Sequence, residues 1–289
     1  MTQRLKTFSL CALGYIAVLA VLFFLRLPFN RHQIWMWFTL QGFSTIVVMM
    51  LVFAVIFSYA DLRLKPLKYA GLAALFALGV AAMFFIAAAL IHGGVPAFRE
   101  VSRVTTFYSG PLRIPINLFQ ILAAASLGCF VSGIVKDKGL LLAVVLVAAC
   151  TDVWTVFAGP VGQALEKIPQ AATATSASLP VAGMKGLYPL AIIGVGDSLF
   201  TGLVAACVAK FGLNMRRNYI FVSVFMTLAM LSLMIFWTVK IPALVVLSVA
   251  VVCANFGEFR LKPAEKRDLA IAFVLFALVL GVISLAMRR

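Results

Sequence analysis

The chain has 289 residues, of which 64% are hydrophobic and only 11% are charged. Soluble domains are about 45 to 50% apolar and about 25% charged, so this composition excludes a soluble globular enzyme. A helix that crosses a bilayer needs about 20 mostly apolar residues, and the hydrophobic residues here are enough for roughly nine such helices. The composition therefore predicts an all-α, polytopic membrane protein with little chain outside the lipid bilayer.

Nine apolar runs follow one another along the chain, and each is interpreted as a transmembrane helix. A transmembrane barrel is excluded because its strands alternate apolar and polar residues, whereas runs such as 70–90 are apolar on every face. The first run is read as a retained span and not a signal peptide, since no small-residue cleavage site precedes Arg26. The nine predicted spans are 8–25, 35–60, 69–92, 114–135, 139–159, 187–209, 218–239, 241–257 and 268–287.

The chain carries 24 lysines and arginines against 9 aspartates and glutamates, a formal net charge of +15. These basic residues stand in short loops and at the ends of the predicted spans, where they determine topology, so no nucleic-acid partner is expected. With nine spans, one side of the membrane holds 14 basic residues and the other side 10, which favours a cytoplasmic amino terminus. The 14 are Arg4, Lys6, Arg63, Lys65, Lys68, Lys136, Lys138, Lys210, Arg216, Arg217, Arg260, Lys262, Lys266 and Arg267.

The five cysteines lie within apolar runs at unrelated spacings, so they predict neither a disulfide framework nor a zinc site. Free cysteines of this kind usually serve as small core residues. No metal or other cofactor is expected. The five are Cys11, Cys129, Cys150, Cys207 and Cys253.

Only two of the nine acidic residues, Asp152 and Asp197, lie inside predicted spans. A carboxylate at the centre of a bilayer helix costs about 2.5 to 3.5 kcal/mol, so each is a candidate functional residue. Asp152 lies near the end of 139–159 and Asp197 lies ten residues into 187–209. Both positions are about 10 to 15 Å from the same membrane face. Adjacent spans run antiparallel, so the two carboxyls can meet.

Two carboxyls that share a site of low dielectric do not both ionise, and one of them keeps its proton. The ionised group can activate a water as general base while the protonated group polarises a peptide carbonyl, which is the chemistry of aspartic proteolysis. Each aspartate taken singly is equally well explained by a polar contact between helices or by a proton relay in a transporter. These alternatives stay open at this point.

Two further patterns accompany the aspartates. Gly194 and Gly196 precede Asp197, although each glycine costs a helix roughly 1 kcal/mol against alanine. A membrane helix tolerates such residues where a partner backbone approaches closely. Pro242 opens a later apolar run as Pro242-Ala243-Leu244. The simplest reading is a helix start, but such a break also frees backbone groups to bind a partner such as an extended peptide.

In this order, the three elements resemble the presenilin and signal peptide peptidase family of GxGD intramembrane aspartyl proteases. That family carries Tyr-Asp on one helix, Gly-x-Gly-Asp on the next and Pro-Ala-Leu on a later one. The corresponding residues here are Thr151-Asp152, Gly194-Val195-Gly196-Asp197 and Pro242-Ala243-Leu244. The resemblance covers the stretch 139–257. Thr151 departs from the usual tyrosine, and four spans precede the first aspartate where the family usually has five.

The resemblance implies a presenilin-like fold of nine helices in which Asp152 and Asp197 are catalytic, and Gly194, Gly196 and 242–244 border the active site and the substrate. It divides the chain into scaffold helices (1–138), catalytic helices (139–257) and a carboxyl-terminal helix (258–289). The substrates would be transmembrane segments or signal-peptide remnants, in the cell (inner) membrane of a prokaryote, with the need for accessory subunits left open. It also implies that the polar loop 161–186 contributes a strand that pairs with an unwound substrate.

Other chemistries fit the residue inventory less well. A zinc protease of the His-Glu-x-x-His type and a rhomboid-like serine protease are excluded, because the only histidines are His32 and His92 and neither stands in a suitable pattern. A prepilin-peptidase-like GxGD protease stays open, although that class lacks Pro-Ala-Leu. A proton-coupled transporter, with Asp152 and Asp197 as relay, also stays open, although the amino-terminal half offers no counterpart of the glycine-rich break.

Overall fold

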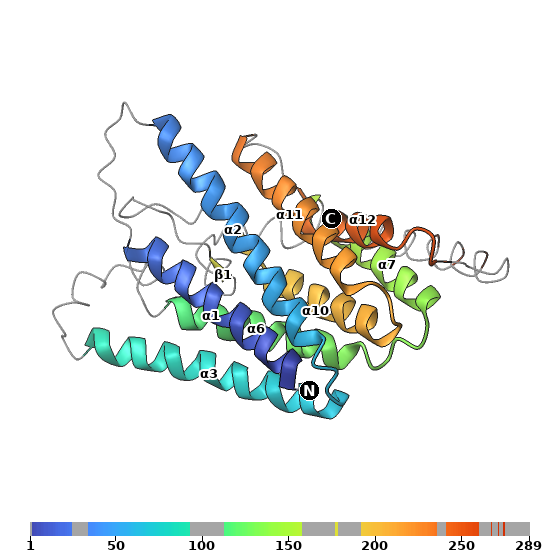
Figure 1. The fold of residues 1–289 in the computed structure, drawn as a ribbon, viewed down its shortest axis with the longest axis horizontal. Coiled ribbons are helices and arrows are strands. Elements are labelled where there is room, and N and C mark those ends of the chain that lie inside the picture. Colours follow the sequence, from blue (N-terminus) through green and yellow to red (C-terminus); the bar gives the residue numbers. More distant parts are fainter. Residues whose placement is uncertain are drawn as a thin grey trace, which may run out of the picture.

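The computed structural model describes residues 2–24, 34–92, 113–157, 177–178, 192–235 and 241–259, together with residues 267, 271 and 274. Within these residues the chain forms eight helices and one pair of two-residue strands (Figure 1). The helices are α1 (Thr2–Phe24), α2 (Ile34–Ala60), α3 (Pro66–His92), α6 (Arg113–Val131), α7 (Lys138–Phe157), α10 (Val195–Lys210), α11 (Met215–Ile235) and α12 (Ala243–Ala254). The strands are β1 (Ala177–Ser178) and β2 (Ile192–Ile193).

Five of these helices are long and apolar enough to cross a membrane, namely α1, α2, α3, α6 and α7. Their bounds lie within a few residues of the predicted spans, except that α1 begins six residues earlier than 8–25. The chain is therefore a helical protein with several candidate membrane spans, compatible with a multi-pass membrane protein. The predicted ninth span, 268–287, lies outside the described residues apart from Ile271 and Val274.

The prediction was wrong about where the helix that carries Asp197 begins. The apolar run starts at 187, but α10 begins only at Val195, and Ile192–Ile193 form a strand. Glycine is a poor helix former, and Gly194 is the extended residue that caps α10, so the helix does not continue backward through the run. Asp197 consequently lies in the first turn of α10 and not ten residues inside a span.

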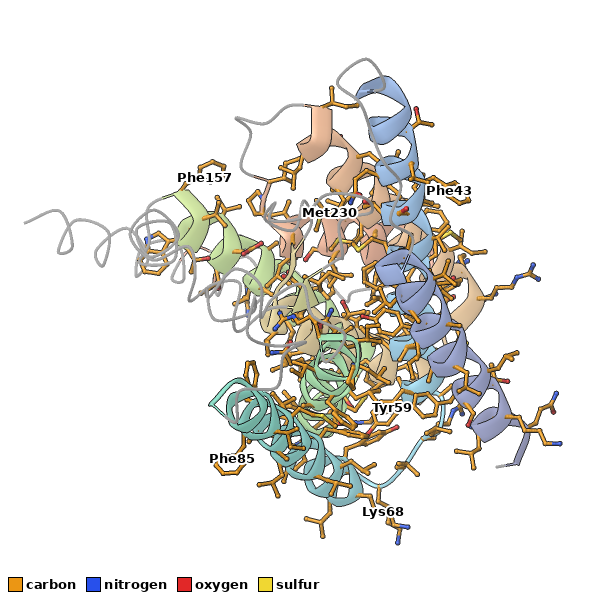
Figure 2. The ribbon with its side chains drawn as sticks, turned by 90° about the vertical axis from the view of Figure 1, so that its left-hand side faces the viewer. Phe43, Tyr59, Lys68, Phe85, Phe157 and Met230 are labelled. Atoms are coloured by element: carbon orange, nitrogen blue, oxygen red, sulfur yellow. The ribbon has the colours of Figure 1, made fainter. Side chains whose placement is uncertain are left out.

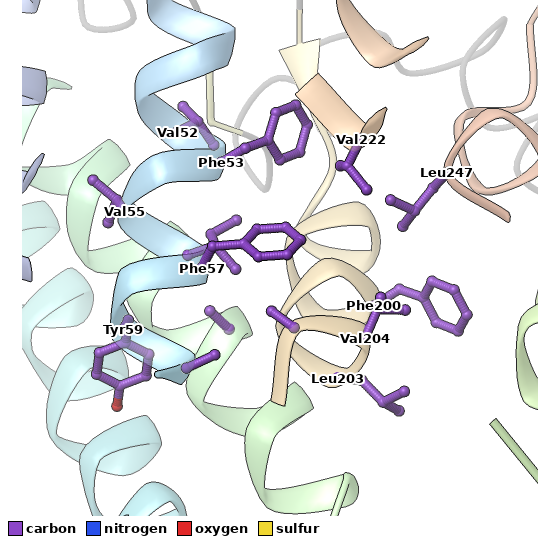
Figure 3. Packing of buried hydrophobic residues seen from close by; sticks show 14 of the residues in the cluster. Val52, Phe53, Val55, Phe57, Tyr59, Phe200, Leu203, Val204, Val222 and Leu247 are labelled. Carbon is purple, nitrogen blue, oxygen red and sulfur yellow. The ribbon is translucent and has the colours of Figure 1, made fainter. Parts of the chain in front are cut away.

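The helices pack in a layered bundle around α2, α6 and α10. α6 packs along α3 and α10, while α2 contacts α1, α10 and α11. α12 lies against α7 and α11, which places it at the side of the bundle that carries the predicted site (Figure 1). The core is apolar: Phe53 and Phe57 of α2 point toward Val204 of α10 and Val222 of α11, and all four are buried (Figure 3).

The outer faces of several helices carry large apolar side chains. Phe43, Phe85 and Phe157 are each more than 60% exposed and point away from the ribbon (Figure 2). In water, such side chains would be costly to expose, whereas hydrocarbon solvates them at no cost. These faces are therefore suited to contact lipid, which is compatible with a multi-pass membrane protein.

The backbones of α6 and α10 are in direct contact. A Cβ atom at Gly128 of α6 would overlap the carbonyl oxygen of Leu199 and lie 2.7 Å from the nitrogen of Leu203. One at Gly202 of α10 would lie 2.6 Å from the carbonyl oxygen of Ala125. The two backbones touch because both contact residues lack side chains, as is common between membrane helices. This contact fixes α10, and with it Asp197, against the centre of the bundle.

The substitution Gly128→Ala is expected to destabilise the protein, because the obstacles are backbone atoms that cannot rotate away. Overpacking of this kind costs about 1 to 3 kcal/mol. Gly71→Ala is the matched control, since no atom lies within 4 Å of its Cβ position on α3. Thermal unfolding in detergent should give a Tm several degrees below wild type for Gly128→Ala, and an unchanged or raised Tm for Gly71→Ala. Equal Tm values for the two variants would contradict the close contact.

Candidate functional site

Asp152 lies on the carboxyl-terminal part of α7, five residues before the helix ends at Phe157. Only Leu141 and Val145 are buried on this helix, and the stretch from Cys150 to Val156 is mainly half-buried. Asp152 itself is half-buried, so its carboxyl is partly shielded and still accessible. The position is open enough for water or another ligand to reach.

The carboxyl of Asp152 binds the start of α12. The backbone N–H of Leu244 donates a hydrogen bond of 2.8 Å to Asp152 Oδ2, across 92 residues of sequence. The first N–H groups of a helix have no partner within it. Pro242 is the residue that caps α12, with φ −66° and ψ 116°, so Leu244 is the second residue of the helix. The break at proline therefore frees a donor, and an aspartate of the neighbouring helix accepts from it.

A second polar contact continues along the same pair of helices. The hydroxyl of Ser248, four residues after Leu244, donates to the carbonyl oxygen of Val145 at 2.9 Å, and Ser248 is buried. Val145 lies seven residues before Asp152, two turns along the same face of α7. The two bonds hold α12 against α7 in one register. The sequence predicted free backbone groups after Pro242, but it did not identify Asp152 as their acceptor. It did not identify Ser248, although a lone serine in an apolar run is a usable signal for such a donor.

Asp197 is held by the backbone that precedes its own helix. The N–H of Gly194 donates to Asp197 Oδ2 at 3.1 Å, and Gly194 is the capping residue of α10. A Cβ at Gly194 would lie 3.1 Å from that same oxygen, so a larger residue would crowd the carboxylate. Gly196 is exposed and has nothing within 4 Å of its Cβ position. The two glycines therefore differ: Gly194 permits close approach, whereas Gly196 leaves open space.

The structure brings the predicted site residues to one region of the fold. Asp152 is bonded to Leu244, and it is near enough to Asp197 for the two charges to interact. α10 also contacts α12, so the helices that carry the three segments 151–152, 194–197 and 242–244 are neighbours, although the segments are far apart in the sequence. Thr151 does not join them through its hydroxyl, which donates to the carbonyl oxygen of Val147 in its own helix.

Each carboxyl keeps one oxygen outside these backbone bonds. For both aspartates the bonds named above use Oδ2, which leaves Oδ1 to bind a water or a proton. Two carboxyls that share one site of low dielectric can divide the roles of acid and base, because only one of them then keeps its proton. The arrangement is suited to polarising a carbonyl and activating water, and it offers no set of metal ligands. In the part of the chain that the structure describes, no group of three His, Cys, Asp or Glu side chains lies together.

The opposite end of α12 is anchored by charges. Glu258 accepts from Lys138 Nζ at 3.0 Å through Oε2 and from Arg217 Nη2 at 2.8 Å through Oε1. One carboxylate thus joins the starts of α7 and α11 to the end of α12. Asn218 and Asn255 exchange two buried amide hydrogen bonds of 3.0 and 2.6 Å beside it. This polar clamp, formed by Lys138, Glu258, Arg217, Asn218 and Asn255, sets where α12 lies, and therefore where Leu244 meets Asp152.

Comparison of the chain with protein-family models, with curated proteins and with solved structures gave no match.

The clamp predicts a pH dependence of stability. The hydrogen bond from Lys138, followed by the one from Arg217, lowers the pKa of Glu258 below its ordinary value of 4.5. Ionised Glu258 therefore stabilises the fold fully above that ordinary pKa, and the contribution is lost as the pH falls through the lowered pKa of the folded protein. Between about pH 5 and 3, wild type should lose one or two degrees more in Tm than Glu258→Gln, because exposed ion pairs contribute little. Parallel Tm profiles of the two proteins would show that the ion pairs of Glu258 with Lys138 and Arg217 carry no stability.

Proposed function

We propose that the chain is an intramembrane aspartyl protease that hydrolyses peptide bonds within transmembrane segments, with Asp152 and Asp197 as its catalytic pair. The observation that carries the proposal is the hydrogen bond from the Leu244 N–H to Asp152 Oδ2. It joins Pro242-Ala243-Leu244 to the first aspartate, which is the association that a presenilin-like site requires. A sequence resemblance built on three short patterns thereby gains a physical contact between two of them.

The proposed reaction uses water as nucleophile. The ionised carboxyl takes a proton from the water, whose oxygen attacks the carbonyl carbon of the scissile bond, while the protonated carboxyl donates its proton to the carbonyl oxygen. The tetrahedral diol then collapses: one of its hydroxyl protons returns to a carboxylate, the amide nitrogen receives a proton from the acid, and the C–N bond breaks. The products are a carboxylic acid and an amine, and the pair regains its single shared proton.

A helical substrate must unwind before this attack, because its peptide bonds are shielded by its own hydrogen bonds. β2 ends one residue before Gly194 and pairs antiparallel with β1, with Ala177 opposite Ile193 and Ser178 opposite Ile192. β1 belongs to the segment 161–186 that was predicted to contribute a strand, and it contacts α6. We propose that an unwound substrate segment adds to this two-stranded unit, where β-pairing compensates the backbone groups that lose their helical partners.

The finer features of the proposal follow from the same resemblance. We propose a presenilin-like arrangement of nine transmembrane helices in the cell (inner) membrane. The five long apolar helices support the multi-pass part of this proposal. The prepilin-peptidase alternative is less favoured, because that class lacks Pro-Ala-Leu, and here Leu244 contacts Asp152. A proton-coupled transporter would use the same two aspartates as a relay, so this alternative is decided by assay.

The test is cleavage of a labelled single-span peptide by the purified protein in detergent. Asp152→Asn and Asp197→Asn keep the shape of each side chain and remove its proton chemistry, so each should lower the cleavage rate by at least about a hundredfold. A transition-state mimic of aspartyl proteases should block the wild type. The matched control is Asp61→Asn, which neutralises an aspartate that pairs with Arg4 and Arg63 at the far end of the bundle. It should cleave at the wild-type rate.

Mass spectrometry of the products should place the cut inside the apolar segment of the peptide. Tm values of all four proteins show whether a loss of cleavage reflects unfolding. Intact peptide with wild type, together with proton-dependent uptake in liposomes, would overturn the protease in favour of a transporter. Full cleavage by either asparagine variant would remove that aspartate from the catalytic pair.

A further inference from the structure

The ends of the helices that lie away from the aspartates meet at one rim of the bundle. Arg4 at the start of α1 pairs with Asp61 after α2, and Pro66 at the start of α3 lies 3.4 Å from the Cβ position of Gly133 after α6. Lys210 at the end of α10 donates to the carbonyl oxygen of Val135 at 2.6 Å. The clamp at Glu258 completes the ring with the starts of α7 and α11 and the end of α12. We call these segments, 4–6, 61–68, 132–138, 210–217 and 255–259, the basic rim.

The basic rim has far more cations than carboxylates. Among its described residues there are ten lysines and arginines and three acidic residues. Asp61 is shared by Arg4 and Arg63, and Glu258 is shared by Lys138 and Arg217, so each carboxylate already serves two cations. Asp137 accepts from the N–H of Leu140 at the start of α7. Five exposed cations of the rim form no ion pair within the described part of the chain: Lys6, Lys65, Lys68, Lys136 and Arg216.

Large apolar side chains stand exposed between these cations. Leu67, which lies between Lys65 and Lys68, is 80% exposed, and Ile134, two residues before Lys136, is 71% exposed. Phe256 in the turn after α12 is 82% exposed. Figure 2 shows Lys68 pointing outward from the first turn of α3. Basic and apolar groups that alternate at the edge of an apolar bundle match the interface of a bilayer. There the apolar residues and the aliphatic part of each lysine side chain enter the outer hydrocarbon region, while the ammonium groups stay at the level of the lipid phosphates.

We propose that the basic rim is a binding surface for anionic phospholipid headgroups, with Lys65, Lys68, Lys136 and Arg216 as the residues that contact the lipid phosphates. Cations held at the interface attract anionic lipids, and the attraction falls with ionic strength because these groups are exposed. Nucleic acid offers the same phosphate charge, but the exposed Leu67 and Ile134 would then remain in water, whereas a bilayer covers them. The proposal does not depend on the protease activity.

The experiment measures binding of fluorescent phosphatidylglycerol to the full-length protein in neutral detergent micelles, with phosphatidylcholine as the uncharged reference. The test variant is Lys65→Gln/Lys68→Gln/Lys136→Gln/Arg216→Gln. The matched control removes an equal number of charges elsewhere in the sequence, as Arg26→Gln/Arg31→Gln/Arg98→Gln/Arg103→Gln. These four arginines follow α1 and α3 along the chain and lie outside the described residues. We expect the test variant to bind phosphatidylglycerol about tenfold more weakly and the control to bind like wild type.

A second variant keeps the charges and changes the side chains: Lys65→Arg/Lys68→Arg/Lys136→Arg should bind like wild type. For wild type, raising the ionic strength from about 0.05 to about 0.5 M should weaken binding of phosphatidylglycerol and leave phosphatidylcholine unaffected. Equal losses in the test and control variants would show that net charge alone attracts the lipid, and would overturn the site. Tighter binding of a single-stranded oligonucleotide than of phosphatidylglycerol would overturn the choice of partner. Size-exclusion profiles establish that the variants remain folded.

Discussion

The bond between the Leu244 N–H and Asp152 Oδ2 is the contact on which the candidate site depends. Both partners would be costly on their own: a free N–H at the start of an apolar helix, and a carboxylate on another helix in the same low-dielectric surroundings. Each satisfies the other. The bond also has a geometric consequence, because α12 begins at the level of Asp152 and Ser248 fixes its register one turn further along. A short helix that begins at a proline is therefore a requirement of the site, not a defect in a span.

Both candidate carboxylates are held at helix starts. Asp197 stands in the first turn of α10 and accepts from Gly194, while Asp152 accepts from the first turn of α12. Backbone N–H groups and the positive end of the helix dipole favour negative charge at these positions. The negative charge of each carboxyl is thus compensated by neighbouring backbone N–H groups, and the bonds described include no lysine or arginine. A cation would hold both carboxyls ionised, whereas neutral donors leave room for a proton to be shared between them, which acid and base catalysis needs.

Sequence patterns predicted those features that depend on composition. The bounds of α2, α3, α6 and α7 follow from runs of about 20 apolar residues, because a bilayer imposes that length. The start of α10 was missed because hydropathy counts Ile192 and Ile193 as apolar whether they form strand or helix. The bond to Leu244 was predicted only in part: the break at Pro242 indicated a free backbone donor, but nothing in the side chain of leucine indicates that Asp152 accepts from it. The clamp was missed because Lys138, Arg217 and Glu258 are far apart in the sequence, and each alone resembles an ordinary topology signal.

The clamp and the aspartates stand at opposite ends of the same short helix, and this separation has a structural reason. α12 has 12 residues, so its two ends are about 18 Å apart, and a rigid helix transmits a shift at one end to the other. Beside its buried apolar residues, α12 is followed by Asn255, whose reciprocal bonds with Asn218 are directional and buried. Buried amides of this kind select one register, since any other leaves them unpaired. The polar groups of the clamp therefore fix the register of α12. That register places the backbone N–H of Leu244 within hydrogen-bonding distance of Asp152.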